Sequence, residues 1–149
     1  MRRSNLQALR RARGRNRYHN YRETVNACED IRTITADGAS ELQMPNLLLQ
    51  QSKDVLITAR FPDMSDGTGM TSTFYIKYDR ITPDTDPTVQ SYSSSIINDP
   101  DNAGATMSQY IIPAADTGMT GVYWWRVDRT DATGKTKTWN YGPLIIQAV

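Results

Sequence analysis

One nine-residue stretch constrains the fold of this chain more than any other. Residues 121–129 read Gly-Val-Tyr-Trp-Trp-Arg-Val-Asp-Arg and hold two of the three tryptophans. Tyr123, Trp125 and Val127 fall on one face of an extended strand, and the residues between them fall on the other. Alternation of aromatic and β-branched residues with period two is typical of a strand in a buried sheet. We therefore expect this strand to nucleate the core, with Trp125 inside it.

Other stretches of the chain carry the same strand signal. Turn-forming residues separate them at roughly ten-residue spacing, and no alternation of strands with helices is visible. The pattern predicts an all-β fold in which two antiparallel sheets pack as a sandwich. The expected strands span residues 55–60, 71–80, 88–97, 106–112, 121–129, and a last strand over 135–148 that breaks near Tyr141-Gly142-Pro143.

We divide the chain into an arm at residues 1–22, a connector at 23–52 and a sandwich domain at 53–149. In the connector, Val25, Cys28 and Ile31 keep helical spacing, but residues 31–35 read equally well as a short strand. Residues 42–49 contain Pro45 and predict an extended edge segment, because proline does not fit a central strand.

The formal net charge of +1 hides a segregation of charge along the chain. The arm holds eight arginines and no acid, whereas residues 23–149 hold nine basic and sixteen acidic residues, a difference of −7. Ser4 or Asn5 could cap a short helix in the arm, and Gly14 could end it. We expect a basic arm, extended or partly helical, that binds an acidic partner.

The arm is the predicted partner-binding site. Its arginines suit forked contacts with carboxylates or phosphates, and its tyrosines suit stacking. The two leucines favour a protein partner, because phosphates gain nothing from them. Binding of nucleic acid is one alternative. The other is that the arm binds nothing and is a solvated tail. The residues concerned are Arg2, Arg3, Leu6, Leu9, Arg10, Arg11, Arg13, Arg15, Arg17, Tyr18, Tyr21 and Arg22.

No pattern in the sequence indicates catalysis, and we expect no enzyme, cofactor or tightly bound metal. The only histidine, His19, lies in the arm, and the only cysteine, Cys28, allows no intrachain disulfide, which fits synthesis in a reducing cytosol. The acidic loops 63–67 and 99–104 lack the spacing of a calcium loop and predict ordinary turns. No apolar run is long enough to span a membrane.

Exposed aromatic residues on the sandwich are the second place where a partner could bind. The candidates are Tyr92, Tyr110, Trp124, Trp139 and Tyr141, which would suit a sugar or a protein neighbour if they are not simply buried. A carbohydrate-binding module using Trp124 or Trp139 is therefore one alternative function.

Residues 116–125, Asp-Thr-Gly-Met-Thr-Gly-Val-Tyr-Trp-Trp, resemble the corner before a late strand of immunoglobulin-like domains, with Tyr123 at the place of the corner tyrosine. Residues 53–149 resemble more closely the immunoglobulin-like domains of tailed-phage virion proteins, such as the N-terminal domain of baseplate upper proteins. The shared features are the Lys-Asp-Val-Leu-Ile-Thr-Ala-Arg opening, an Asp-Gly loop, Phe-Tyr-Ile-Lys-Tyr, the tryptophan strand and the Asp-Ala-Thr-Gly-Lys turn. The arm is not part of that pattern.

The resemblance implies a virion structural protein: a minor capsid, decoration or connector component made in the host cytoplasm. The partners it implies are other virion proteins, capsid or tail subunits, with further copies of the same chain in the particle. A tail or baseplate adaptor is the alternative within this class.

Overall fold

The computed structural model describes residues 30–36 and 46–148, and in this part of the chain the regular structure is β-strand with one short 3-10 helix. The elements are β1 (Asp30–Thr35), β2 (Leu47–Gln50), β3 (Val55–Phe61), β4 (Thr71–Lys77), β5 (Gln90–Ser95), β6 (Ile97–Asn98), β7 (Thr106–Ile112), η1 (Ala114–Thr117), β8 (Gly121–Thr130) and β9 (Thr136–Gln147). No helix among the described residues is long and apolar enough to cross a membrane. The all-β fold is as predicted.

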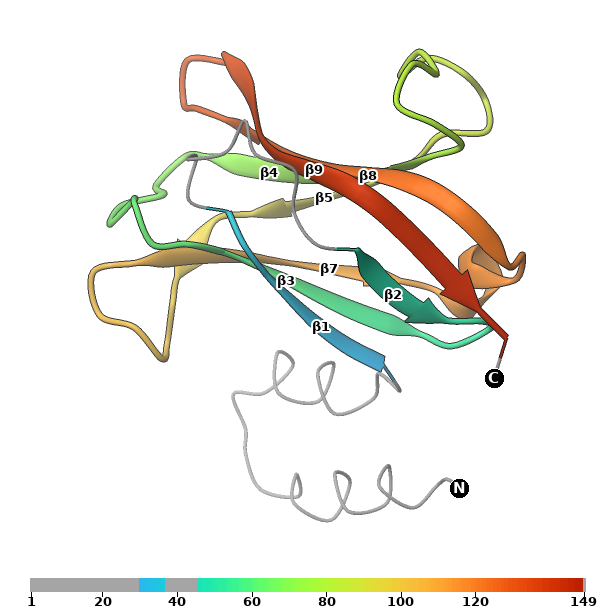
Figure 1. Ribbon diagram of the computed structural model, residues 1–149. Helices are drawn as coiled ribbons and strands as arrows, with labels where there is room; N and C mark the ends of the chain where they lie inside the picture. The colour runs from blue at the N-terminus through green and yellow to red at the C-terminus, as the bar shows by residue number, and fades with distance from the viewer. Residues whose placement is uncertain (1–29, 37–45, 149) are drawn as a thin grey trace.

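The strands form two sheets that pack face to face (Figure 1). The four-stranded sheet has the order β1-β3-β7-β6, and the five-stranded sheet has the order β2-β9-β8-β4-β5. Strand β8 lies in the middle of the larger sheet, between β9 and β4. The strand with the strongest sequence signal therefore has a hydrogen-bonded neighbour on each side.

The predicted antiparallel pairing holds within the rest of both sheets but is wrong at one edge of each. β1 pairs with β3 in parallel, and β2 pairs with β9 in parallel. Both strands come from residues 23–52, which the sequence assigned to a connector. Parallel neighbours need a long connection, and the chain supplies it by passing from β1 in one sheet to β2 in the other before it enters β3 (Figure 1).

The side chains between the sheets are those that the alternation placed there. Trp125 is 1% exposed and Val127 is fully buried, while the half-buried Tyr123 packs against the same core. Phe74 of β4 stacks between Tyr110 and Trp125, with ring centroids 5.6 and 6.0 Å away. The rest of the core is aliphatic apart from Phe61, and its aliphatic members are Ile34, Ala36, Leu47, Leu49, Val55, Ile57, Ala59, Ile76, Ile96, Ile112, Leu144 and Ile146.

The predicted break in the last strand is wrong. β9 runs without interruption from Thr136 to Gln147 along β8, with one irregularity opposite Val127 and Asp128. Gly142 lies opposite Trp125 in the register, so no side chain competes there with the indole. Pro143 precedes the first residue of β9 that pairs with β2, so its missing N–H removes no bond from that ladder.

The corner before β8 has the geometry that its sequence indicates. The Tyr123 hydroxyl donates a hydrogen bond of 2.8 Å to the carbonyl of Met119, four residues upstream. The Thr117 hydroxyl joins η1 to the turn before β3, because it donates to the Lys53 carbonyl and accepts from the Lys53 N–H. These contacts fix the end of the sandwich at which β8 begins.

Candidate interaction surface

The predicted partner-binding residues of the arm, from Arg2 to Arg22, lie outside the described residues, as do His19 and Cys28. Among the described residues, the candidate interaction surface is the outer face of the five-stranded sheet. On β8, Trp125 and Val127 point into the core, so Val122, Trp124 and Arg126 belong to the outer face. Their register partners on β9 and β4 extend this face across the sheet.

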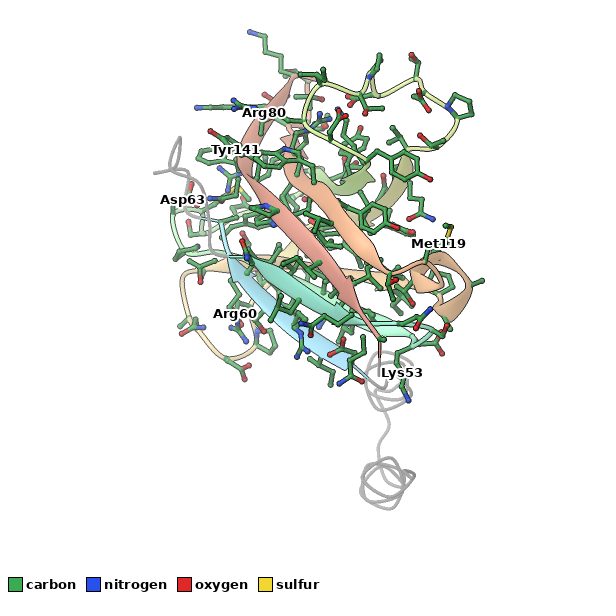
Figure 2. All side chains as sticks on the ribbon, turned by 45° about the vertical axis from the view of Figure 1, so that its right-hand side comes forward. Lys53, Arg60, Asp63, Arg80, Met119 and Tyr141 are labelled. Carbon is green, nitrogen blue, oxygen red and sulfur yellow. The ribbon has the colours of Figure 1, made fainter. Side chains whose placement is uncertain are left out.

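An arginine lies over two aromatic rings on this face. The Arg80 guanidinium is 5.8 Å from the centre of the Trp124 ring and 5.0 Å from that of Tyr141. The two rings stack on each other with centroids 5.5 Å apart, and Figure 2 shows Arg80 beside Tyr141. We call Arg80, Trp124 and Tyr141 the aromatic platform. Cation–π contacts of this kind hold a guanidinium in place while leaving its N–H groups free to donate.

A second cluster attaches the 78–89 loop to the same face. The Asp84 carboxylate accepts two hydrogen bonds from the Arg126 guanidinium, at 3.0 and 2.8 Å, and one from Lys77 Nζ at 3.0 Å. Arg126 also binds Asp128, and its guanidinium lies 4.2 Å from the centre of the Tyr75 ring. We call Lys77, Asp84, Arg126 and Asp128 the Asp84 clasp.

The pKa values in the clasp follow from this geometry. The hydrogen bonds from Arg126, and less strongly those from Lys77, outweigh partial burial and lower the pKa of Asp84 to about 2. Burial acts to lower the pKa of Arg126, but its hydrogen bonds with Asp84 and Asp128 raise it above the ordinary arginine value. Both shifts favour the charged forms, so Asp84 and Arg126 form an ion pair at neutral pH.

An exposed apolar row borders the platform. Ile145 of β9 pairs with Val122 of β8 on one side and with Leu48 of β2 on the other. Val122 is 68% exposed and Leu48 is 39% exposed. We call Leu48, Ile145 and Val122 the apolar row. Tryptophan, tyrosine and arginine, the residue types of the aromatic platform, are enriched at the energetic centres of protein interfaces.

Of the aromatic residues that the sequence offered as exposed, the structure brings only Trp124 and Tyr141 together on the outer face. Tyr110 is buried in the core, where its hydroxyl meets that of Ser72. Tyr92 is half-buried against the core and donates a hydrogen bond of 2.8 Å to Asp116. Trp139 packs against the core, and the Arg129 guanidinium lies 3.5 Å from the centre of its ring. That guanidinium takes up ring surface on which a sugar would stack.

The acidic loops behave as turns and as ion-pair partners. Asp66 accepts the N–H and hydroxyl of Thr68 within its own turn. Asp63 pairs with Arg129 at 3.0 Å, and Asp99 pairs with Arg60 at 2.6 Å. In the described part of the chain, no three histidine, cysteine or acidic side chains gather as metal ligands would.

A recess of about 180 Å³ lies at the end of the sandwich, between η1 and the ends of β4 and β8. Tyr78 and Tyr123 stack beside it with centroids 5.8 Å apart, and the exposed Met119 stands at its rim. Asp116 contributes a carboxylate to the lining, already bound by Tyr92. The recess has room for about one large side chain.

Sequence reasoning missed Arg80, Asp84 and the apolar row. The sequence placed Arg80 at the end of a strand over 71–80, which is wrong, because β4 ends at Lys77 and Arg80 lies in the following loop. Asp84 lies in the same loop, and Trp124 and Arg126, which these two residues contact, are more than forty positions away along the chain. Leu48 belongs to a segment correctly predicted to be an edge. The signal for the row was available in the alternation of β8, which places Val122 on the same face as Trp124.

No family model and no curated protein matches the sequence. Among solved structures, the fold is similar to the N-terminal domain of ORF48 of phage TP901-1, with a TM-score of 0.50. The match covers 79% of this chain and 98% of that chain at 10% sequence identity. At so low an identity the likeness concerns the fold alone. This chain therefore shares its β-sandwich fold with a domain of a phage protein.

Proposed function

We propose that this chain is a structural protein of a bacteriophage particle. The observation that carries the proposal is the fold shared with the N-terminal domain of TP901-1 ORF48, which this chain covers almost completely. The outer face of the five-stranded sheet supports it, because an arginine on stacked aromatic rings beside an apolar row suits contact with another protein.

The finer role that we propose is a minor capsid, decoration or connector component. The arm, with eight arginines and two leucines, anchors the chain by forked contacts with acidic groups on a neighbouring subunit. The sandwich then presents its outer sheet face to the next protein in the particle. A tail or baseplate adaptor would use the arm and the outer sheet face of the sandwich in the same way.

The test is a protein inventory of purified particles. Mass spectrometry of intact particles, and of separated capsids and tails, should find the chain at a fixed copy number in one fraction. Its absence from particles made in an infection that expresses it would overturn the proposal.

Deletion of residues 1–22 tests the anchoring role of the arm. We expect the shortened chain to stay folded and soluble and to be lost from particles, because the described sheets begin only at Asp30. A matched variant with the arginines of the arm changed to lysine keeps the charge but loses the guanidinium forks. Normal incorporation of the shortened chain would show that anchoring lies in the sandwich.

A further inference from the structure

We propose that the outer face of the five-stranded sheet, together with the 78–89 loop, binds the same face of a second copy of this chain. The proposal deepens the proposed function by naming one partner, and it rests on that function only for its setting in a particle. It is tested on purified protein, so its failure and the failure of particle membership are separate results.

The first observation is an apolar surface with no described neighbour over it. The apolar row runs across three strands and includes Val122, one of the most exposed apolar side chains of the described chain. Ile81, at 86% exposure, lies in the loop between Arg80 and Asp84, both of which contact the outer face. Contiguous exposed apolar groups beside aromatic rings mark interaction sites on soluble domains.

The second observation is that Arg80 has no anionic partner among the described residues. The described carboxylates include none that pairs with it, whereas the two cations of the Asp84 clasp, Lys77 and Arg126, pair with Asp84 and Asp128. The stacked rings of the aromatic platform already hold the guanidinium in one place. Binding of a carboxylate therefore costs little side-chain entropy, which favours a specific forked contact.

The third observation is the position of spare carboxylates in the same loop. One oxygen of Asp79 accepts from Ile81 and Thr82, and one oxygen of Asp86 accepts from Thr88. Neither aspartate has a cationic partner among the described residues, and in each the hydrogen bonds within the turn all go to one oxygen of the carboxylate. The turns fix these two carboxylates in the same loop that carries Arg80.

These three features belong to the outer face and to the 78–89 loop, which Arg80 and Asp84 attach to it, and each feature has its complement among the others. A two-fold contact brings the same patch of two copies together, so residue i meets residue j and j meets i. Arg80 of one copy then faces the carboxylates of the other copy's loop, while the exposed Ile81 of each meets the other's apolar row. A partner of a different kind would need only a carboxylate for Arg80 or only a cation for the loop carboxylates. The face and its loop carry both charges, as a contact between two identical copies requires.

The experiment measures self-association of the full chain by sedimentation equilibrium across about 1 to 100 µM, a range suited to a contact of moderate affinity. The test variants are Val122→Lys and Arg80→Glu. The matched control is Ile111→Lys, which adds the same charge at a 42% exposed position on the outer face of the other sheet. Thermal unfolding verifies that each variant is folded.

We expect a dimer whose dissociation constant rises at least about tenfold in each test variant and stays unchanged in the control. We also expect added salt to weaken the wild-type dimer more than the Arg80→Gln variant, because screening acts on the Arg80 contact. A chain that stays monomeric throughout overturns the proposal. So does a dimer that neither test variant weakens, or one that Ile111→Lys weakens equally.

Discussion

Trp125 shows how one residue ties the sheets together. Its indole is 1% exposed and stacks on Phe74, which in turn stacks on Tyr110 from the opposite sheet. The contact therefore spans both layers of the sandwich. An aromatic side chain in this position contributes burial and ring stacking at once.

Trp125→Ala should lower the free energy of unfolding by about 3–5 kcal/mol, because it removes buried surface and leaves a cavity. Trp124→Ala is the matched control, since it removes the same side chain from the outer face, and it should cost less. Urea unfolding of both variants measures the difference. An equal loss for the two variants would contradict the assignment of Trp125 to the core.

The side of the strand to which each side chain points was what the sequence predicted best. Period-two alternation placed Tyr123, Trp125 and Val127 inward, and the structure confirms this because side chains on a strand must alternate. The same rule placed Trp124 outward but said nothing of Arg80. The contact between Arg80 and Trp124 depends on how the 78–89 loop folds back onto the sheet. The local sequence does not encode that path of the loop.

The loop before β4 depends on a glycine that has no room for a side chain. A Cβ on Gly67 would lie 2.4 Å from Cγ2 and 2.9 Å from Cβ of Ile96. Ile96 is 6% exposed and belongs to the core, so it cannot move aside freely. The backbone there also forms the bond from the Met70 N–H to the Gly67 carbonyl.

Gly67→Ala should therefore destabilise the protein by about 1–3 kcal/mol through overpacking. Gly104→Ala is an informative comparison, because nothing lies within 4 Å of its Cβ position and only its φ of +84° opposes the change. Denaturant unfolding of the two variants separates steric clash from backbone strain. A Gly67→Ala variant as stable as wild type would contradict the close packing against Ile96.

The Asp84 clasp predicts a stability contribution that depends on pH. The pKa of Asp84 is lowered to about 2 in the folded chain, so the folded state favours the ionised carboxylate. This contribution is complete above the ordinary aspartate pKa of about 4 and is lost as the pH falls from there towards 2. Because the Asp84 side chain is 45% exposed, solvent screening limits it to about 1 kcal/mol.

Comparison of wild type with Asp84→Asn at several pH values measures this contribution. The difference in unfolding free energy should be largest near neutral pH and should shrink in acid. Asp101→Asn, in the exposed pair with Arg60, controls for the general effect of removing a charge. A difference that grows towards low pH would have the wrong sign for a lowered pKa and would refute the clasp.

At the level of elements, the sequence predicted the strands of the sheet interiors but not the parallel direction of the edge strands β1 and β2. β3, β4, β7 and β8 carry long alternating patterns that only a strand satisfies. The segments of β1 and β2 are short, and their pairing is with strands distant in sequence. Their parallel direction follows from the path of the chain between the two sheets, which no local pattern reveals.

On the scale of the whole molecule, the arm carries only basic residues, whereas acidic residues outnumber basic ones in the rest of the chain. The described cations mostly neutralise described carboxylates: Arg32 with Asp30, Arg60 with Asp99, Arg126 with Asp84 and Arg129 with Asp63. The last three pairs join strands to loops within the sandwich, whereas Arg32 and Asp30 both belong to β1. The concentration of arginines in the arm is evident from the sequence, and their partner stays a prediction.

The parallel pairing of β2 with β9 affects how the protein folds while it is being synthesised. Leu47 and Leu144 are partners in that ladder, so β2 leaves the ribosome long before β9, its ladder partner in the described sheet, exists. Until β9 emerges, the Leu-Leu-Leu-Gln strand and one edge of β8 both stay open, and such edges attract other chains. A nascent chain that stalls before Thr136 is therefore the form of this protein most exposed to aggregation.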